Sequence, residues 1–279
     1  MATKLAYQSS KWEKELRNKE KVWKQLNGQM AAQNNLTALI KRNETIDSSQ
    51  RDYCRIYSNM HLGYQIIAGN LYLRDQQDTH CLDYCYLSGM SGVFSHLFDT
   101  SEMQCHRDTT EQQNAIKDFA FSLLQLYAVN QPIPPCVQKM EHLYVKLLMG
   151  DFERVNSLLL ETGTEFDSDN PHKLWVGVTE RTIIQSLIDK DEAALQKAIT
   201  ARIREYRKWP VGYSTFIDVY SIAMIKLAYQ HGMHCEIDVI EIPKFFFDEE
   251  VCSIDNTEIK IPFFDDALEQ LKKLGIIWP

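Results

Sequence analysis

The chain has 279 residues, of which 44% are hydrophobic and 24% charged, so it can bury a full core as one large domain or two small ones. Its net charge of -8 argues against general binding to nucleic acid, which needs a basic surface. No segment is long and apolar enough to cross a membrane, and residues 1–15 lack a signal-peptide core, so we expect a cytoplasmic protein.

The first predicted helix begins at a capping box formed by Ser10 and Glu13, and its apolar residues recur at heptad-like spacing. Those residues are Trp12, Leu16, Trp23, Leu26 and Met30. Residues 1–50 carry nine lysines or arginines against five acids. The interleaved glutamates favour a solvated helix face over a surface that binds an anion.

Three more helices are predicted before residue 131. The second begins near Asp47 or Ser48, and we expect its core-facing residues to be Tyr53, Ile56, Tyr57, Met60, Tyr64 and Ile67. The third spans His80–Phe98 and contains SGMSG, whose small residues allow a neighbouring helix to approach closely. The fourth begins at Asp108 or Thr109, and its core face is Ile116, Phe119, Ala120, Leu123, Leu124 and Tyr127.

A proline-rich link and two helical hairpins follow. Residues 131–135 (QPIPP) end the fourth helix and suit the first turn of a fifth. The hairpins span Met140–Leu160, with Gly150-Asp151 as the turn, and Ile183–Ile199, with Lys190-Asp191 as the turn. This arrangement is similar to the packing unit of αα-repeat proteins, although the tetratricopeptide consensus is absent.

The segment Thr215–Gly232 predicts a central helix. Thr215 followed by Asp218 indicates the start, and Gly232 is a suitable residue just past the end. Polar residues interrupt the segment only at Asp218, Ser221, Lys226 and Gln230. A helix that is apolar around most of its circumference is usually packed by neighbours on several sides.

After the central helix the pattern changes to alternation, which predicts extended chain over 233–243 and again over 259–262, before a last helix over Asp265–Leu274. The sequence therefore predicts a mainly α fold, a helical bundle or stacked αα-hairpins with a short extended C-terminal segment. We expect a single domain of residues 1–279, with a division conceivable near residues 131–135.

The same C-terminal region carries the net charge of the chain. Residues 236–266 contain ten acids against two lysines, a net charge of -8. The related stretches IPKFFFDEE and IPFFDDA place aromatic residues beside carboxylates. Because charge speeds encounter and aromatic residues anchor partners, we expect a protein-binding surface here. Its predicted residues are Asp248, Glu249, Glu250, Asp255, Glu258, Asp265 and Asp266.

Motifs for catalysis or cofactor binding are missing from the sequence. There is no P-loop, dinucleotide fingerprint or H-E-x-x-H, and Gly89–Gly92 lacks the spacing of a nucleophile elbow. The strongest metal candidates are His80, Cys81, Cys85, Cys105 and His106, and a weaker group is His231, His234 and Cys235. Seven scattered cysteines are more typical of buried, reduced thiols. We expect no cofactor, no metal and no catalytic residue.

Phe216–Pro243 resembles the C-terminal region of the immunity protein 49 family of bacterial polymorphic toxin systems. The shared features are a helix ending in Ala228-Tyr229 and Gly232, an alternating acidic segment, and a terminal Ile242-Pro243. They cover about a tenth of the chain, and Asp248–Pro279 has no counterpart in the family.

The resemblance implies a cytosolic protein that binds a cognate toxin, such as a nuclease or another basic effector, and neutralises it by occluding its active site. It implies neither catalysis nor direct contact with nucleic acid or membrane. The acidic residues named above come from charge patterning and not from the family. Two alternatives stay open: a helical-repeat scaffold that binds other proteins, and an all-α enzyme with a carboxylate-bound metal.

Overall fold

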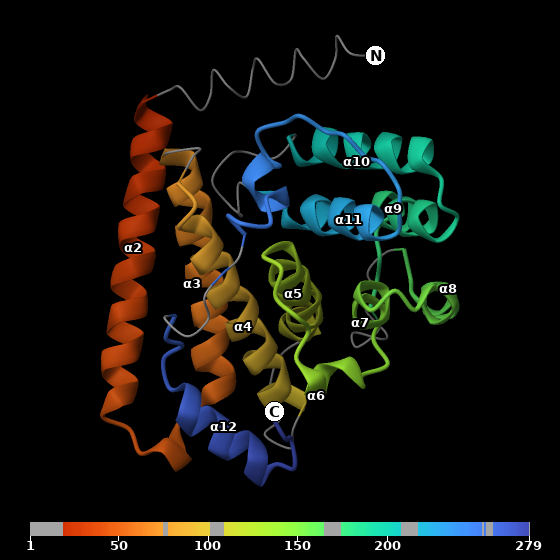
Figure 1. Cartoon of the computed structure of the whole chain (residues 1–279). Coiled ribbons are helices and arrows are strands. Elements are labelled where there is room, and N and C mark those ends of the chain that lie inside the picture. Colours follow the sequence, from red (N-terminus) through yellow and green to blue (C-terminus); the bar gives the residue numbers. More distant parts are fainter. Residues whose placement is uncertain are drawn as a thin grey trace.

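The computed structural model describes residues 19–74, 78–100, 109–164, 174–207, 217–252, 254 and 259–278. Its α-helices are α2 (Lys19–Glu44), α3 (Tyr53–Arg74), α4 (Cys81–Thr100), α5 (Thr109–Ala128), α6 (Pro135–Gln138), α7 (Leu143–Leu148), α8 (Phe152–Glu161), α9 (Val178–Ile188), α10 (Glu192–Tyr206), α11 (Val219–Gln230) and α12 (Phe264–Lys273). Short 3-10 helices occupy Ser48–Gln50 (η1) and Lys244–Phe247 (η2). No described residue belongs to a β-strand, and the predicted mainly α fold is confirmed (Figure 1).

The first four described helices form a layered bundle. α2 packs on α3, α3 on α4, and α4 on α5, so each helix lies beside the next in sequence (Figure 1). The predicted core residues of α3 are all buried, and those of α5 are buried or half-buried. Met30 on α2 is 61% exposed, because the face of α2 toward α3 carries Ala32 and Leu36 instead. Ser10, Glu13, Trp12 and Leu16 lie outside the described residues.

Small residues bring α4 and α5 together, as SGMSG predicts. A Cβ added at Gly89 would lie 2.9 Å from Leu126 and 3.0 Å from the Ser122 carbonyl oxygen. A Cβ added at Gly92 would overlap the Ser122 hydroxyl and lie 2.8 Å from His61 Nδ1. The backbones are therefore closer than any larger side chain at these two positions would permit.

Both predicted hairpins are present, as α7–α8 and α9–α10. Asp151 and Asp191 cap the second helix of each, because their side chains accept hydrogen bonds from Arg154 N (3.2 Å) and Ala194 N (2.9 Å). Gly150 reaches φ +74° in the first turn. The hairpins are neighbours, since α8 packs against α9. The predicted fifth helix, α6, is only four residues long and begins at Pro135.

The central helix α11 is buried throughout Val219–Ala228 and packs on both α5 and α9. Its N-cap is Asp218, whose side chain accepts from Ser221 N (3.3 Å) and Ser221 Oγ (2.6 Å). The helix therefore starts later than the expected Thr215, which lies outside the described residues. Gly232 follows its C-terminus at φ +75°, as predicted.

The C-terminal segment returns to the N-terminal helices. Residues 233–238 alternate in burial, as expected for extended chain, although they pair with no strand in the described part of the molecule. Tyr72 donates to the Ile240 carbonyl (2.7 Å) and Tyr57 to that of Pro262 (3.0 Å). Trp278 stacks on Phe94 with 5.0 Å between ring centroids. One hydrophobic core therefore joins residues from both sides of the 131–135 link.

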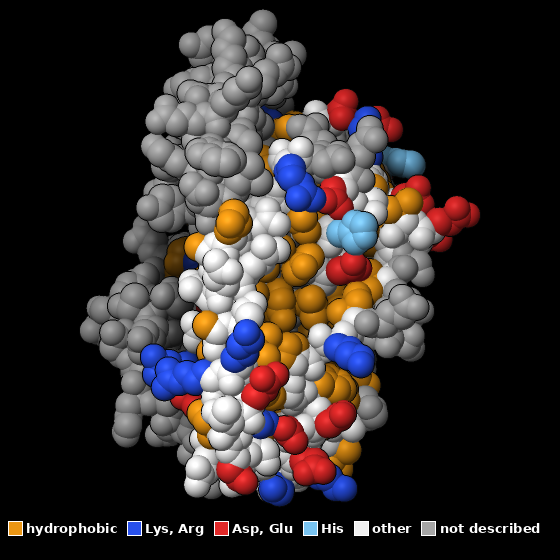
Figure 2. All heavy atoms as spheres, turned by 90° about the vertical axis from the view of Figure 1, so that its left-hand side faces the viewer, with side chains coloured by type: hydrophobic (Ala, Val, Ile, Leu, Met, Phe, Trp, Pro, Cys, Tyr) orange, Lys and Arg blue, Asp and Glu red, His pale blue; other side chains and the backbone are white. Residues whose placement is uncertain are grey.

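Figure 2 shows the side of the molecule on which α2 lies, where hydrophobic side chains gather in an elongated area. Between α2 and α3 lies a groove of about 510 Å³, lined by Leu36, Leu39 and Ile66 and by the exposed Leu62. None of the described helices is long and apolar enough to span a lipid bilayer.

Candidate functional sites

The predicted acidic residues Asp248, Glu249 and Glu250 form an exposed turn directly after η2. The Asp248 carboxylate accepts hydrogen bonds from Glu250 N (3.0 Å) and Val251 N (3.2 Å), so this side chain shapes the turn. Glu249 and Glu250 remain the exposed carboxylates that a partner could contact.

A second acidic pair opens α12. Asp265 is exposed, whereas Asp266 forms an ion pair with Arg51, whose side chain is only 9% exposed. The Arg51 guanidinium also lies over the Phe263 ring, 4.6 Å from its centroid. Asp266 therefore holds α12 to the start of α3. The remaining predicted residues, Asp255 and Glu258, lie outside the described residues.

The two acidic groups lie at opposite ends of α3. Asp266 pairs with Arg51, two residues before α3 begins, whereas Phe245 of η2 packs edge-on against Tyr72 near its other end. With 1.5 Å of rise per residue, Tyr53 and Tyr72 are roughly 28 Å apart. The described acids therefore form two separate groups, and α12 lies well away from the upper end of α3 in Figure 1.

The aromatic residues beside these acids serve the core. Phe246 is fully buried, and Phe264 packs edge-on against Phe94 at 5.4 Å. Phe245 and Phe247 are half-buried against Tyr72 and Tyr229. None of these four phenylalanines is an exposed anchor, so an apolar contact for a partner must come from elsewhere.

A groove of about 620 Å³ lies next to the acidic turn. Its lining includes Tyr127, Ile133, Met149 and Glu249. Met149 is 50% exposed. We call this region the acidic groove.

The polar floor of the acidic groove is formed by Lys226 and Cys252. Lys226 Nζ donates to the Ala128 carbonyl (2.5 Å) and Asn130 Oδ1 (2.7 Å), and lies 3.5 Å from Cys252 Sγ. Burial lowers the pKa of the Lys226 amine and raises that of the Cys252 thiol. These contacts fix the acidic turn to α11 and to the C-terminal end of α5.

The predicted metal ligands are not brought together in the described residues. Cys81 and Cys85 are buried in α4, where burial raises the pKa of both thiols, that of Cys85 to about 12. His80 is exposed and contacts Asp78 instead (3.0 Å). Cys105 and His106 lie outside the described residues. Within the described ranges no group of three or more His, Cys, Asp or Glu side chains could hold a metal ion.

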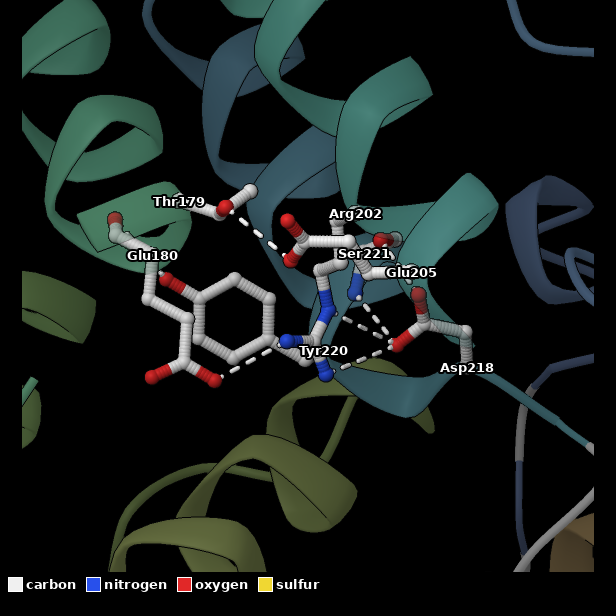
Figure 3. A network of polar contacts seen from close by, with 7 residues as sticks. All are labelled: Thr179, Glu180, Arg202, Glu205, Asp218, Tyr220 and Ser221. Atoms are coloured by element: carbon white, nitrogen blue, oxygen red, sulfur yellow. Dashed lines mark hydrogen bonds and ion pairs between the residues drawn. The ribbon is translucent and has the colours of Figure 1, made fainter. Parts of the chain in front are cut away.

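A polar network that local sequence patterns do not indicate joins α9, α10 and α11. The Arg202 guanidinium lies between two carboxylates, that of Glu180 (2.9 Å) and that of Asp218 (3.3 Å) (Figure 3). Its Cζ is also 4.3 Å from the centroid of the Tyr220 ring. Burial alone would lower the pKa of Arg202, but the two carboxylates raise it. Arg202 is therefore a permanent cation that ties three helices together.

This network forms one wall of a pocket of about 320 Å³ between α5, α9, α10 and α11, which we call the aromatic pocket. Other walls are aromatic or aliphatic, and they include Phe121, Leu124, Tyr144, Leu174 and Tyr220. Lys117 of α5 also lines it, with Nζ 2.7 Å from the centroid of the Trp175 ring. Burial lowers the pKa of Lys117 to about 8.

Sequence reasoning misses this pocket because its residues come from six separate segments. Only Asp218 carries a local signal, as an acid at the start of an apolar helix.

The chain was compared with protein-family models, with curated proteins and with solved structures. No family model, curated protein or solved structure matches it.

Proposed function

We propose that this protein is an immunity protein, which binds a cognate bacterial toxin and neutralises it by covering the toxin's active site. The observation that carries the proposal is the position of the acidic turn. Exposed Glu249 lines the acidic groove beside exposed Glu250, and exposed Met149 lines the same groove. An acidic rim attracts a basic partner, while the groove can receive an anchoring side chain beside Met149 and Ile133.

A basic toxin, such as a nuclease whose site attracts phosphate, would be drawn to this rim by the same charges that draw it to its substrate. In this proposal the protein acts in the cytoplasm as an inhibitor, needs no cofactor, and performs no catalysis. The limited resemblance of Phe216–Pro243 to the immunity protein 49 family points in the same direction.

The first experiment uses the neighbouring reading frame in the source genome. Its product, or the C-terminal domain of that product, is expressed alone in a bacterial host and then together with this protein. We expect death of cells that make the neighbour alone, survival on co-expression, and a stable complex of the two proteins. A neighbour that is harmless, or that kills despite co-expression, would reject the immunity role.

The contact surface is tested separately with the purified toxin. The double variant Glu249→Lys and Glu250→Lys reverses the exposed charges and leaves Asp248 to shape the turn. The control is Glu44→Lys with Glu161→Lys, which makes the same charge change at the exposed last residues of α2 and α8. We expect association at low salt to slow at least about tenfold for the first variant only, with a smaller difference at high salt.

Equal association rates for the two double variants would show that the acidic groove is not the contact surface. The variant Asp265→Lys then tests the other acidic group. Slower association of this variant would place the contact at the start of α12.

A second candidate function, a helical-repeat scaffold that binds a peptide or helix, is favoured by the adjacent hairpins α7–α8 and α9–α10. Each has an aspartate cap at the start of its second helix. A scaffold has no need of a toxic neighbour, so the co-expression experiment separates the two functions.

A further inference from the structure

The aromatic pocket contains a lysine whose ammonium has no hydrogen-bond acceptor among the described residues. Trp175 also lines the pocket, but its indole Nε1 is fully buried and out of reach of a ligand. Lys117 Nζ contacts the face of the Trp175 ring, and no described oxygen accepts a hydrogen bond from it. A desolvated ammonium without a hydrogen-bond acceptor costs free energy, even though the Glu180 carboxylate stabilises the charge of Lys117 from nearby. An acceptor entering the pocket would reduce that cost.

Three acids line the pocket, namely Asp118, Glu180 and Asp218. Asp118 is exposed to solvent. Glu180 and Asp218 both bind Arg202, and Asp218 also accepts from Ser221 as the N-cap of α11. Arg202 is the cation of this network, and its charge is already balanced because it lies between two carboxylates and against the Tyr220 ring. Lys117 is therefore the cation in the pocket whose hydrogen-bonding capacity is unused within the described residues.

The remaining walls indicate the body of a ligand. Phe121, Tyr144 and Tyr220 supply ring surfaces, and Leu124 and Leu174 supply aliphatic ones. A volume of about 320 Å³ lies at the small end of the usual range for ligand pockets, roughly 300–1,000 Å³. Such walls can stack on a flat apolar group.

We propose that the aromatic pocket binds a small organic anion with a planar apolar body, namely an aromatic carboxylate. Lys117 supplies the charge partner, and Trp175 supplies a ring surface. This binding activity is independent of the proposed inhibition of a toxin, because the pocket uses none of the residues of the acidic groove.

The test uses four probes of graded charge with the whole protein: benzoate, 2-naphthoate, neutral benzamide and cationic benzylamine. Binding is measured by isothermal titration calorimetry at pH 7 and by quenching of tryptophan fluorescence. We expect both carboxylates to bind, and to bind at least about tenfold more tightly than benzamide or benzylamine, because a charge-assisted hydrogen bond contributes more than a neutral one. Preference for benzylamine, or no carboxylate binding at millimolar concentration, would overturn the proposal.

Variants then assign the charge partner. Lys117→Met keeps the aliphatic stem without the charge, and we expect it to weaken benzoate binding about tenfold or more. Lys117→Arg keeps the charge and should retain most of the affinity, which separates loss of the cation from loss of fold. Trp175→Phe keeps a ring surface and should retain most of the affinity, because the indole N–H is buried out of reach of a ligand. The matched control, Lys139→Met at an exposed site outside the pocket, should bind as the native protein does.

The pH dependence gives an independent readout. Because burial lowers the pKa of Lys117 to about 8, benzoate affinity should fall as pH rises above that value. The titratable neighbours in the pocket are Asp118, Glu180, Arg202, Asp218 and the tyrosines 144, 206 and 220. An affinity that is constant between pH 7 and 9.5, or unchanged by Lys117→Met, would reject Lys117 as the charge partner.

Discussion

The close contact between α4 and α5 predicts that a glycine-to-alanine substitution has opposite effects on stability at Gly92 and at Gly28. A Cβ at Gly92 would overlap Ser122 Oγ and lie 2.9 Å from Ser122 Cβ and 2.8 Å from His61 Nδ1. Carbon atoms normally approach to about 3.5–4.0 Å, so α4 and α5 must separate by roughly an ångström. Gly28 in α2 has the opposite surroundings, because a Cβ there would meet nothing within 4 Å.

The cost at Gly92 can be estimated from its parts. Overpacking costs about 1–3 kcal/mol, and turning Ser122 Oγ away breaks its hydrogen bond to the Asp118 carbonyl for about another 1 kcal/mol. The better helix propensity of alanine offsets about 1 kcal/mol of this destabilisation. We expect Gly92→Ala to destabilise the fold by about 2 kcal/mol and Gly28→Ala to stabilise it by roughly 0.5–1 kcal/mol.

Urea unfolding followed by circular dichroism at 222 nm measures both free energies. The double variant Gly92→Ala with Ser122→Gly removes the clashing hydroxyl and Cβ, so it should be less destabilised than the sum of the single variants. Equal stability of Gly92→Ala and Gly28→Ala would refute the close helix contact.

Three further predictions concern buried charge. Arg207→Met leaves Glu241 fully buried without its ion-pair partner. We expect the free energy of unfolding, measured with urea, to fall by about 3–5 kcal/mol. Burial lowers the pKa of His142 to about 4 from 6.5, so the unfolded state takes up the proton first and stability should fall by about 3 kcal/mol as pH drops from 6.5 to 4. His142→Phe should flatten that part of the stability–pH curve. Asp266→Asn removes the negative charge that pairs with the buried Arg51 side chain, and it should lower the free energy of unfolding by about 1 kcal/mol.

Each of these predictions has a control. Lys244→Met breaks the exposed pair with Asp238 and should leave the unfolding curve unchanged. Replacing Arg207 and Glu241 together by apolar residues should recover much of the loss, and a double variant as unstable as Arg207→Met would contradict the assignment. If the His142→Phe protein keeps the native pH dependence of stability, His142 is not the group responsible. The acid sensitivity would then belong to another group, such as the buried His61.

The helices were predictable because their signals are local. The two hairpin turns, a Gly-ended apolar helix and the repeated tyrosines of α3 each depend on neighbouring residues, and the structure confirms them. Met30 was less predictable, because the face that α2 buries depends on how α3 lies against it. The start of α11 differs for a related reason, since Asp218 rather than Thr215 provides the cap.

The sites were much less predictable, because they depend on which distant segments meet. Charge patterning found the acidic turn, but it could not show that Asp266 is tied to Arg51 or that the neighbouring phenylalanines are core residues. Glu180 and Arg202 are ordinary surface-type residues in amphipathic helices, and only the tertiary fold brings them together in one wall of the pocket. Lys117 and Trp175 likewise belong to segments about 60 residues apart.

The return of the C-terminal segment to α3 and α4 has a consequence for biosynthesis. Phe94 emerges from the ribosome roughly 180 residues before Trp278, the ring that stacks on it. At about 5–20 residues per second, the α3–α4 surface stays uncovered for roughly 10–40 s on every nascent chain. During that interval its apolar side chains are accessible to chaperones and to other nascent chains. Synonymous changes that slow translation of the last third should therefore lower the soluble yield without altering a single amino acid.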